Sequence, residues 1–380
     1  MTLLERAASV EVVDDIVLPF AVESLSTRGR LVRLGPAIDL LLKRHYYPEP
    51  VSRLVGEAVT LAALLGSTLK TSGRFQLQTK SDGPVTMLLV DFDAPSHLRA
   101  LARFDKARLE GAQAGGDLLG HGHLAFTIDP GGDMNRYQGV IALEGQGLEA
   151  AAHHYFERSE QIPTLVRLAV GEIVTADGAA WRAGGLVVQY LPDAGGRRLR
   201  ADFPPGDAPA GVEPHTIAED DAWTEAKTRA ATTEAHELID PMLSGERLLF
   251  RLFNERGVRV YAPTPLAAVC RCSAEGVDAM LRSFPPEEVR GMVGDDGMIG
   301  VTCEFCSTTR TFNPADYGAK GRKPRQWTIA PSRLGSRNVR LGSSASSKSC
   351  LASNPGLASR RVPSASSRRC VMRRLAAVSG

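Results

Sequence analysis

The sequence predicts an α+β fold, and three observations lead to this expectation. Apolar residues spaced three and four apart over residues 51–70 predict a long buried helix. Apolar and polar residues alternate over 74–80, and a turn sequence at 81–84 precedes an apolar run at 85–90, which together predict a β-hairpin. After residue 318 the composition changes abruptly to serine and arginine, which indicates that the fold ends there.

The same patterns predict the other elements of the N-terminal part. Helices are expected at residues 36–47 and 148–158, and strands at 123–128, 137–143, 164–170 and 185–190. This mixture of strands and helices indicates an N-terminal α+β domain over residues 1–195, with a large and mostly antiparallel sheet.

Residues 196–262 are interpreted as a metastable helical linker region. Residues 193–220 are rich in Gly, Pro, Asp and Arg, as loops are. A helix is expected over 221–238, but its few large apolar residues predict weak burial. A second helix is expected over 244–255, with Gly257 in the position of a C-terminal cap.

The charge is distributed unevenly along the chain. The whole chain carries +2, but residues 319–380 contain fourteen Lys or Arg and no acid, which leaves −12 on residues 1–318. The tail also contains thirteen Ser and little apolar periodicity, so we expect residues 318–380 to be disordered. Either a functional basic extension or a shifted reading frame would account for this tail.

Nothing in the chain predicts export or a membrane span. The N-terminal residues lack the basic start, apolar run and cleavage site of an export signal. The longest apolar stretch, residues 51–69, contains Arg53 and Glu57, which predicts a buried helix because a span needs about 20 mostly uncharged residues. We therefore expect a cytoplasmic protein without membrane partners, in which thiols stay reduced.

Four cysteines form the strongest chemical signal. Cys270 and Cys272 make a C-x-C pair, thirty residues follow, and Cys303 and Cys306 make a C-x-x-C pair. Two close pairs separated in this way predict one tetrahedral zinc ion per chain, bound by thiolates in a small C-terminal zinc-binding domain, residues 263–317. Oxidation of the close pairs would expel the metal, which makes a redox switch possible, although most four-cysteine sites are purely structural.

Other candidate sites are weaker, and none indicates an enzyme. His121 and His123 could both ligate a metal, but a polar strand start is the simpler interpretation. His153 and His154 are expected on a helix surface, and two further cysteines, Cys350 and Cys370, fall in the predicted tail. No motif of a nucleophilic or acid–base site is present, and four cysteine ligands leave no open position for metal catalysis.

The chain resembles the bacterial redox-regulated chaperone family of heat shock protein 33, over about residues 18–317. The segments that carry the resemblance, in chain order, are Arg28 to Val32, Ser81 to Pro84, Arg136 to Val140, Leu143 to Gly145, Tyr155 to Phe156, Ser159 to Thr164, Ala183 to Gly185, Cys270 to Ser273, Pro285 to Val289 and Cys303 to Cys306. Each segment is short, but their common order makes the resemblance specific. Ser307 and Arg310 depart from the family pattern, at positions expected to affect the packing of the predicted hairpin and not metal ligation.

The resemblance implies an ATP-independent holdase that protects unfolded client proteins. It implies an inactive, reduced, zinc-bound form, and activation by disulfides Cys270–Cys272 and Cys303–Cys306 with zinc release and unfolding of the linker. It also implies that the oxidised form is a homodimer. A zinc-ribbon nucleic-acid-binding protein that uses the basic tail is the alternative, but the acidic charge of residues 1–318 disfavours it.

Overall fold

A computed structural model describes residues 14–69, 73–110, 115–131, 135–175, 178–191 and 221–318. The expected loop at 193–220, the basic tail from residue 319 onward, and Cys350 and Cys370 lie outside these residues. In the described part of the chain, no helix is long and apolar enough to cross a membrane.

Fourteen strands are present in the described residues. They are β1 (Ile16–Val22), β2 (Thr27–Leu34), β3 (Arg74–Ser81), β4 (Val85–Asp93), β5 (His97–Phe104), β6 (His121–Asp129), β7 (Tyr137–Glu144), β8 (Thr164–Thr175), β9 (Gly178–Tyr190), β10 (Arg259–Val260), β11 (Thr264–Pro265), β12 (Ala267–Ala268), β13 (Ile299–Thr302) and β14 (Thr309–Phe312). All six strands expected from the sequence are among them, and most are longer than expected because their ends lack apolar alternation.

The helices in the same residues are mostly short. They are α1 (Pro36–Lys43), α2 (Glu49–Gly66), α3 (Gly115–Leu119), α4 (Leu148–Tyr155), α5 (Asp221–Ala231), α6 (Ala235–Ile239), α7 (Gly245–Phe253), α8 (Ala274–Leu281), α9 (Pro286–Gly291) and α10 (Ala315–Gly318). Single turns lie at η2 (Glu23–Leu25), η3 (Lys106–Arg108), η4 (Phe156–Glu160) and η5 (Asn254–Arg256).

The strands form two six-stranded sheets and one hairpin. Sheet A has the order β10-β1-β2-β9-β8, with β11 also paired to β1, and sheet B has the order β12-β5-β4-β3-β6-β7. Every pair in the two sheets is antiparallel except β12 with β5. The α+β class and the mostly antiparallel pairing are therefore confirmed, but the strands divide between two sheets where one large sheet was expected.

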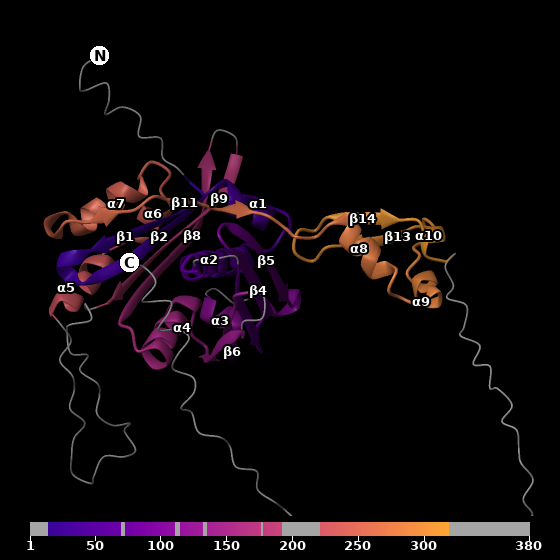
Figure 1. Ribbon diagram of the computed structural model, residues 1–380, viewed down its shortest axis with the longest axis horizontal. Coiled ribbons are helices and arrows are strands. Elements are labelled where there is room, and N and C mark those ends of the chain that lie inside the picture. The colour runs from indigo at the N-terminus through magenta and orange to yellow at the C-terminus, as the bar shows by residue number, and fades with distance from the viewer. Residues whose placement is uncertain are drawn as a thin grey trace, which may run out of the picture. The chain divides into compact units, whose positions relative to one another are not determined.

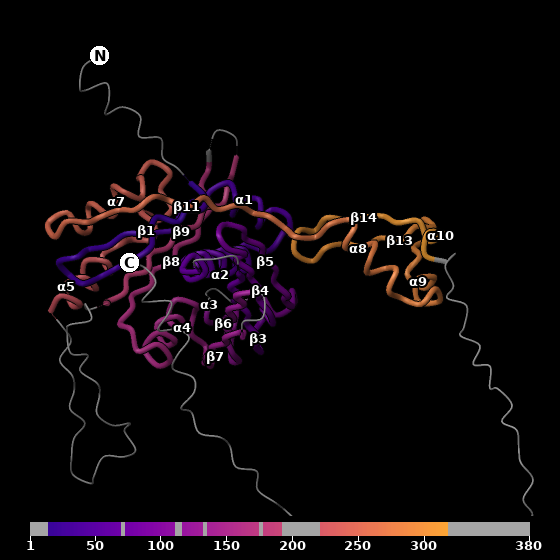
Figure 2. Tube along the Cα trace, viewed as in Figure 1, coloured from indigo at the N-terminus to yellow at the C-terminus, as the bar shows by residue number. Residues whose placement is uncertain are grey.

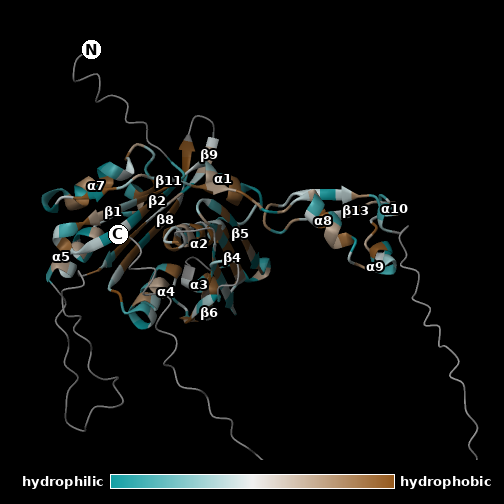
Figure 3. Cartoon of the chain, viewed as in Figure 1, coloured by the Kyte–Doolittle hydropathy of each residue, from teal (hydrophilic) through white to brown (hydrophobic). Residues whose placement is uncertain are grey.

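Helix α2 packs against strands of both sheets and forms the centre of the main core (Figure 1). Fourteen of its eighteen residues are buried, because one side faces sheet A and another faces sheet B. Figure 3 shows hydrophobic colouring in the visible part of α2. Burial of this extent confirms the buried helix that the apolar periodicity predicted.

Helices α5, α6 and α7 cover the other face of sheet A (Figure 2). The sequence predicted one helix over 221–238 with weak burial, and both expectations are wrong. The helix is divided between α5 and α6, and its apolar residues are almost fully buried, including Trp223 at 4% exposure and Leu238 at 1%. Alanines on the buried side give α5 a small apolar face that still packs closely.

Two adjacent glycines in β9 permit the close approach of helices from both sides. A Cβ at Gly184 would lie 2.2 Å from the backbone oxygen of Leu238 in α6. A Cβ at Gly185 would lie 2.6 Å from Thr60 Cγ2 in α2. Sheet A is therefore sandwiched between helices at a separation that a larger side chain would prevent.

A strap, residues 259–268, crosses from one sheet to the other. Its first strands, β10 and β11, pair with β1 at the edge of sheet A. Its last strand, β12, pairs with β5 at the edge of sheet B. The strap ends two residues before Cys270, so it connects the linker helices to the first cysteine pair.

The described residues fall into two compact units. One holds residues 14–274 and 301–310, and the other holds residues 275–300 and 311–318. The second unit has a small core of Leu281, Val289, Ile299 and Tyr317. All four cysteines of the predicted zinc site belong to the first unit. The domain division predicted from the sequence stays a prediction.

Candidate metal centre

Local backbone structure brings the members of each cysteine pair together. The C-x-C pair follows the strap, where the Val269 N–H donates to Leu98 O at 3.1 Å. The C-x-x-C pair lies in the turn between β13 and β14, as expected for the hairpin. There the Ser307 N–H donates to Cys303 O at 2.8 Å, and Ser307 adopts a left-handed conformation with φ of 54°. This tight turn directs both sulfurs to one side.

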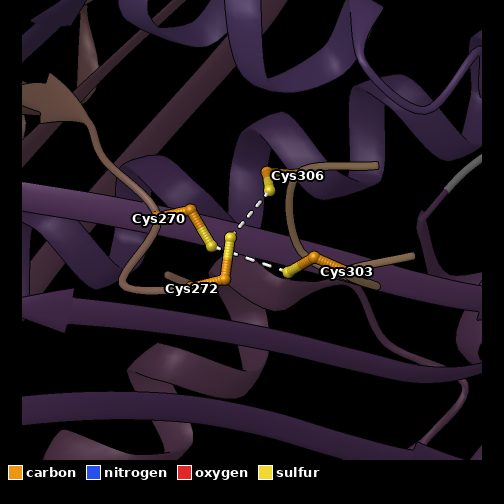
Figure 4. A group of neighbouring side chains, drawn as sticks. All are labelled: Cys270, Cys272, Cys303 and Cys306. Carbon is orange, nitrogen blue, oxygen red and sulfur yellow. Dashed lines mark hydrogen bonds between the residues drawn. The ribbon is translucent and has the colours of Figure 1, made fainter. Parts of the chain in front are cut away.

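The four sulfurs form a compact cluster (Figure 4). All lie within 4.8 Å of one another. The shortest separations join the two pairs, with 3.7 Å between Cys270 Sγ and Cys303 Sγ and 3.4 Å between Cys272 Sγ and Cys306 Sγ. Zinc–sulfur bonds of about 2.3 Å in a tetrahedron place sulfurs about 3.8 Å apart. The donor set and its spacing therefore fit a zinc ion.

Two side chains hydrogen-bond with the cluster. Arg310 Nη1 donates to Cys272 Sγ at 3.4 Å, and Arg310 Nη2 donates to the backbone oxygen of Cys272 at 3.3 Å. The Thr308 hydroxyl lies 3.3 Å from Cys306 Sγ. Because four thiolates around one zinc carry a net negative charge, a guanidinium at this position offsets it. Arg310, which departs from the family pattern, thus contacts the candidate site directly.

The thiols are not equivalent without a metal. Burial, together with hydrogen bonds that its thiol donates to the other three cysteines, raises the pKa of Cys272 to about 12. Burial alone would also raise the pKa of Cys306, but hydrogen bonds from Thr308 and from two neighbouring thiols lower it to about 6. The thiol of Cys306 therefore ionises more readily than that of Cys272.

The residue between the first two cysteines anchors this pair to sheet B. Arg271 Nη2 lies 3.3 Å from Asp91 Oδ2, and Arg271 Nε lies 3.1 Å from Asp93 Oδ2. The Asp91 side chain has no exposed surface, and it also accepts hydrogen bonds from Arg99 and Gln76. A buried carboxylate with ionic partners loses much of its stabilisation when one partner leaves.

The second pair is anchored by different contacts. The Arg99 guanidinium lies over the Phe305 ring at 3.9 Å, and Arg103 Nη2 donates to Glu304 at 2.9 Å. His45 Nε2 lies 3.1 Å from Phe305 O, while its Nδ1 lies 3.2 Å from the Ser307 hydroxyl. Both cysteine pairs are therefore fixed to the same unit by side chains that lie far away in the sequence.

The comparisons with known proteins agree on one family. A family model described as Hsp33 protein matches residues 15–313. This chain belongs to the Hsp33 family. It is 46% identical over 318 residues to the 33 kDa chaperonin of Caulobacter vibrioides, which covers 82% of this chain and 99% of that protein. It is 33% identical over 293 residues to the 33 kDa chaperonin of Vibrio cholerae, covering 77% of this chain and 90% of that one.

A solved structure supports the fold. The crystal structure of the Thermotoga maritima 33 kDa chaperonin matches with a TM-score of 0.63 at 19% identity, covering 80% of this chain and 96% of that chain. The chain is accordingly an Hsp33-family chaperone, and its cysteine cluster is compatible with redox-regulated zinc binding.

The other candidate residues do not form a site in the part of the chain that the structure describes. His121 and His123 are exposed at the start of β6, and they belong to no group of potential metal ligands found there. His153 is half-buried, which makes the expectation of a surface position wrong for it, whereas His154 is exposed. The Val166 N–H donates to His153 Nε2 at 2.8 Å. This contact gives His153 a structural role, because it joins α4 to β8.

Proposed function

We propose that this chain is a redox-regulated, ATP-independent holdase that is inactive when reduced and zinc-bound. The observation that carries the proposal is the position of the sulfur cluster. The cluster follows directly after the strap, and the strap follows the helices that cover an apolar sheet face. Oxidation of the sulfurs can thus loosen the strap, and with it the attachment of those helices to sheet A.

Cys270, Cys272, Cys303 and Cys306 would hold one zinc ion in the reduced form. When bound, the metal supplies a cross-link between the two cysteine pairs, in place of reactive thiols. Closing a loop the size of the thirty-residue segment between them corresponds to about 3–4 kcal/mol of chain entropy. Arg310 supports the bound form, because its guanidinium lies beside the sulfur of Cys272.

Activation is a two-electron oxidation of each cysteine pair. Two thiols form one S–S bond and give up two electrons and two protons, and hydrogen peroxide accepts them to become water. The family resemblance assigns the bonds Cys270–Cys272 and Cys303–Cys306. Thiolates that have become disulfides no longer ligate zinc, so the cross-link between the two pairs is lost.

The surface under the linker helices is the proposed client-binding surface. On sheet A it consists of Leu18, Phe20, Leu31, Leu165, Leu186 and Val188, and the helices cover it with Trp223, Leu248, Leu249, Leu252 and Phe253. Both sides of this contact are buried and apolar, so separation of the helices exposes a contiguous hydrophobic face. Faces of this kind bind other proteins.

Buried charge makes the attachment of these helices marginal. Arg33 and Arg182 lie under α6 with side-chain exposures of 1% and 7%. They donate to backbone oxygens of α6 and of the residues after it, and both form ion pairs with Asp14. Arg33 Nε is buried and has no hydrogen-bond partner among the described residues, which costs part of what the apolar contact contributes. This accounts for a metastable linker.

The remaining features of the proposal come from the family. Its partners are unfolded client proteins, and the oxidised form is a homodimer. The chain acts in the cytoplasm, binds clients without catalysing a reaction, and is divided at residues 195, 262 and 317 into a chaperone core, a linker and a zinc-binding domain.

The test measures zinc release and aggregation together. Reduced protein should contain one zinc per chain and protect a heat-denatured client poorly, and peroxide or hypochlorite should release the zinc and start protection. Cys270→Ser combined with Cys303→Ser should abolish zinc binding, whereas Cys350→Ser combined with Cys370→Ser should change nothing. Equal protection by the reduced and oxidised forms would refute the switch, and stoichiometric zinc in the first double variant would refute the site.

A further inference from the structure

A cavity of about 390 Å³ lies in the first unit, away from the cysteines. It lies at the C-terminal end of α2, where residues of β2 and β9 in sheet A face residues of β3 and β6 in sheet B. Its apolar walls include Phe20, Leu64, Phe75, Phe126, Phe156 and Val187. This volume lies in the range of small-molecule sites, which are mostly apolar with a few polar groups.

Arg30 is the charged group of this cavity. It lies opposite Val187 in the pairing of β2 with β9, on the face of sheet A that Val187 directs toward the main core. Arg30 is half-buried and no described residue bonds to its guanidinium, whereas the buried Arg33 and Arg182 and the half-buried Arg99 each have a carboxylate partner. Burial lowers the pKa of Arg30 to about 10, which leaves it charged at neutral pH.

The other polar groups of the cavity do not neutralise Arg30. Glu160 accepts a hydrogen bond from the Tyr155 hydroxyl at 2.7 Å, and burial raises the pKa of this carboxyl. No ion pair joins Glu160 to Arg30 among the described residues. An unpaired guanidinium in an apolar site is costly, and an anionic ligand removes that cost.

The cavity has an access route from solvent. Arg28 and Tyr261 are among its lining residues, and both are exposed, Tyr261 at 46%. A molecule with an apolar chain and one anionic end can therefore enter without displacing the core.

The geometry points to a binding site for a fatty acid, with its carboxylate on Arg30 and its hydrocarbon chain against the phenylalanines. A planar guanidinium matches a carboxylate with two parallel hydrogen bonds. The site goes beyond the proposed function, and it needs neither zinc nor a disulfide.

Calorimetry on the full-length, reduced, zinc-loaded protein tests this inference, with decanoate below its micelle concentration as the probe. Decanoate should bind at one site per chain. Decanol, which has the same chain without the charge, should bind at least tenfold more weakly. Arg30→Gln should weaken decanoate binding at least tenfold, whereas Arg247→Gln, at an exposed arginine of α7, should stay within twofold of the wild type.

Thermal unfolding without ligand separates a binding role from a structural one. Arg30→Gln should not lower the melting temperature, because it removes an unpaired charge. The inference is overturned by an absence of saturable decanoate binding, by equal binding of decanol, by unchanged binding in Arg30→Gln, or by a clear loss of thermal stability in that variant.

Discussion

Phe253→Ala should make the reduced, zinc-bound protein an active holdase. Phe253 lies in α7 with no exposed surface, and its ring centroid is 5.8 Å from that of Phe20 in sheet A. Truncation of a buried phenylalanine to alanine costs about 3–5 kcal/mol. If that cost falls on the attachment of α7 to sheet A, it increases the detached fraction about a hundredfold to several thousandfold.

Phe250→Ala is the matched control, because Phe250 lies in the same helix at 61% exposure. A surface truncation of this kind changes stability by less than about 0.5 kcal/mol. Both variants should retain one zinc per chain. In the reduced state, only Phe253→Ala should suppress aggregation of a heat-denatured client, and only its helices α5 to α7 should become sensitive to limited proteolysis.

Two results would refute the reasoning. If the helices of Phe253→Ala resist proteolysis as the wild type does, the contact with sheet A contributes less than its burial indicates. If the helices are cleaved readily but the reduced variant still protects no client, the exposed face of sheet A is not the client-binding surface. Loss of zinc in this variant would show that detachment of the helices also weakens the metal site.

Three further predictions concern the cysteine pairs and the core. Arg271→Ala removes an ionic partner of the buried Asp91, at a cost of about 1–2 kcal/mol in the attachment of the first cysteine pair. Peroxide should therefore release zinc several-fold faster from this variant than from the wild type. An unchanged rate of zinc release would contradict this role of Arg271. Peptide mapping of oxidised protein should find disulfides within each cysteine pair. The shortest sulfur–sulfur distances join the two pairs, and disulfides formed there would contradict the proposed activation. Burial raises the pKa of Glu57 to about 7, so the wild type loses stability as pH rises from about 4.5 to 7. Glu57→Gln should therefore exceed the wild type in the free energy of urea unfolding by about 3 kcal/mol at pH 8 and by less than about 1 kcal/mol at pH 5.

Sequence patterns predicted the elements that have one exposed face or a clear helical period. The β3–β4 hairpin and α2 were found in this way, and the cysteine spacing predicted a four-sulfur cluster that the structure brings together. Strands β1 and β2 were not predicted, because neither shows the alternation that marks a half-exposed strand. β1 is apolar throughout and contains Pro19, and in β2 the arginines at 28, 30 and 33 interrupt the apolar residues.

The surroundings of the cysteines could not be predicted for a different reason. His45, Asp91 and Arg99 contact the cysteine-bearing segments from about 180 to 260 residues away along the chain. No spacing rule connects such residues, and each has the ordinary appearance of a polar side chain near a helix end or on a strand. Only the tertiary fold shows that they lie beside the candidate site.

The strap has a consequence for the edges of both sheets. Strands β1 and β5 would each present a row of unsatisfied backbone N–H and C=O groups if β10, β11 and β12 did not pair with them. Such an edge is a template for any extended polypeptide, because main-chain hydrogen bonds recognise no particular sequence. Detachment of residues 259–268 therefore opens two templates at once. An unfolding protein, or a second copy of this chain, could add a strand to either of them.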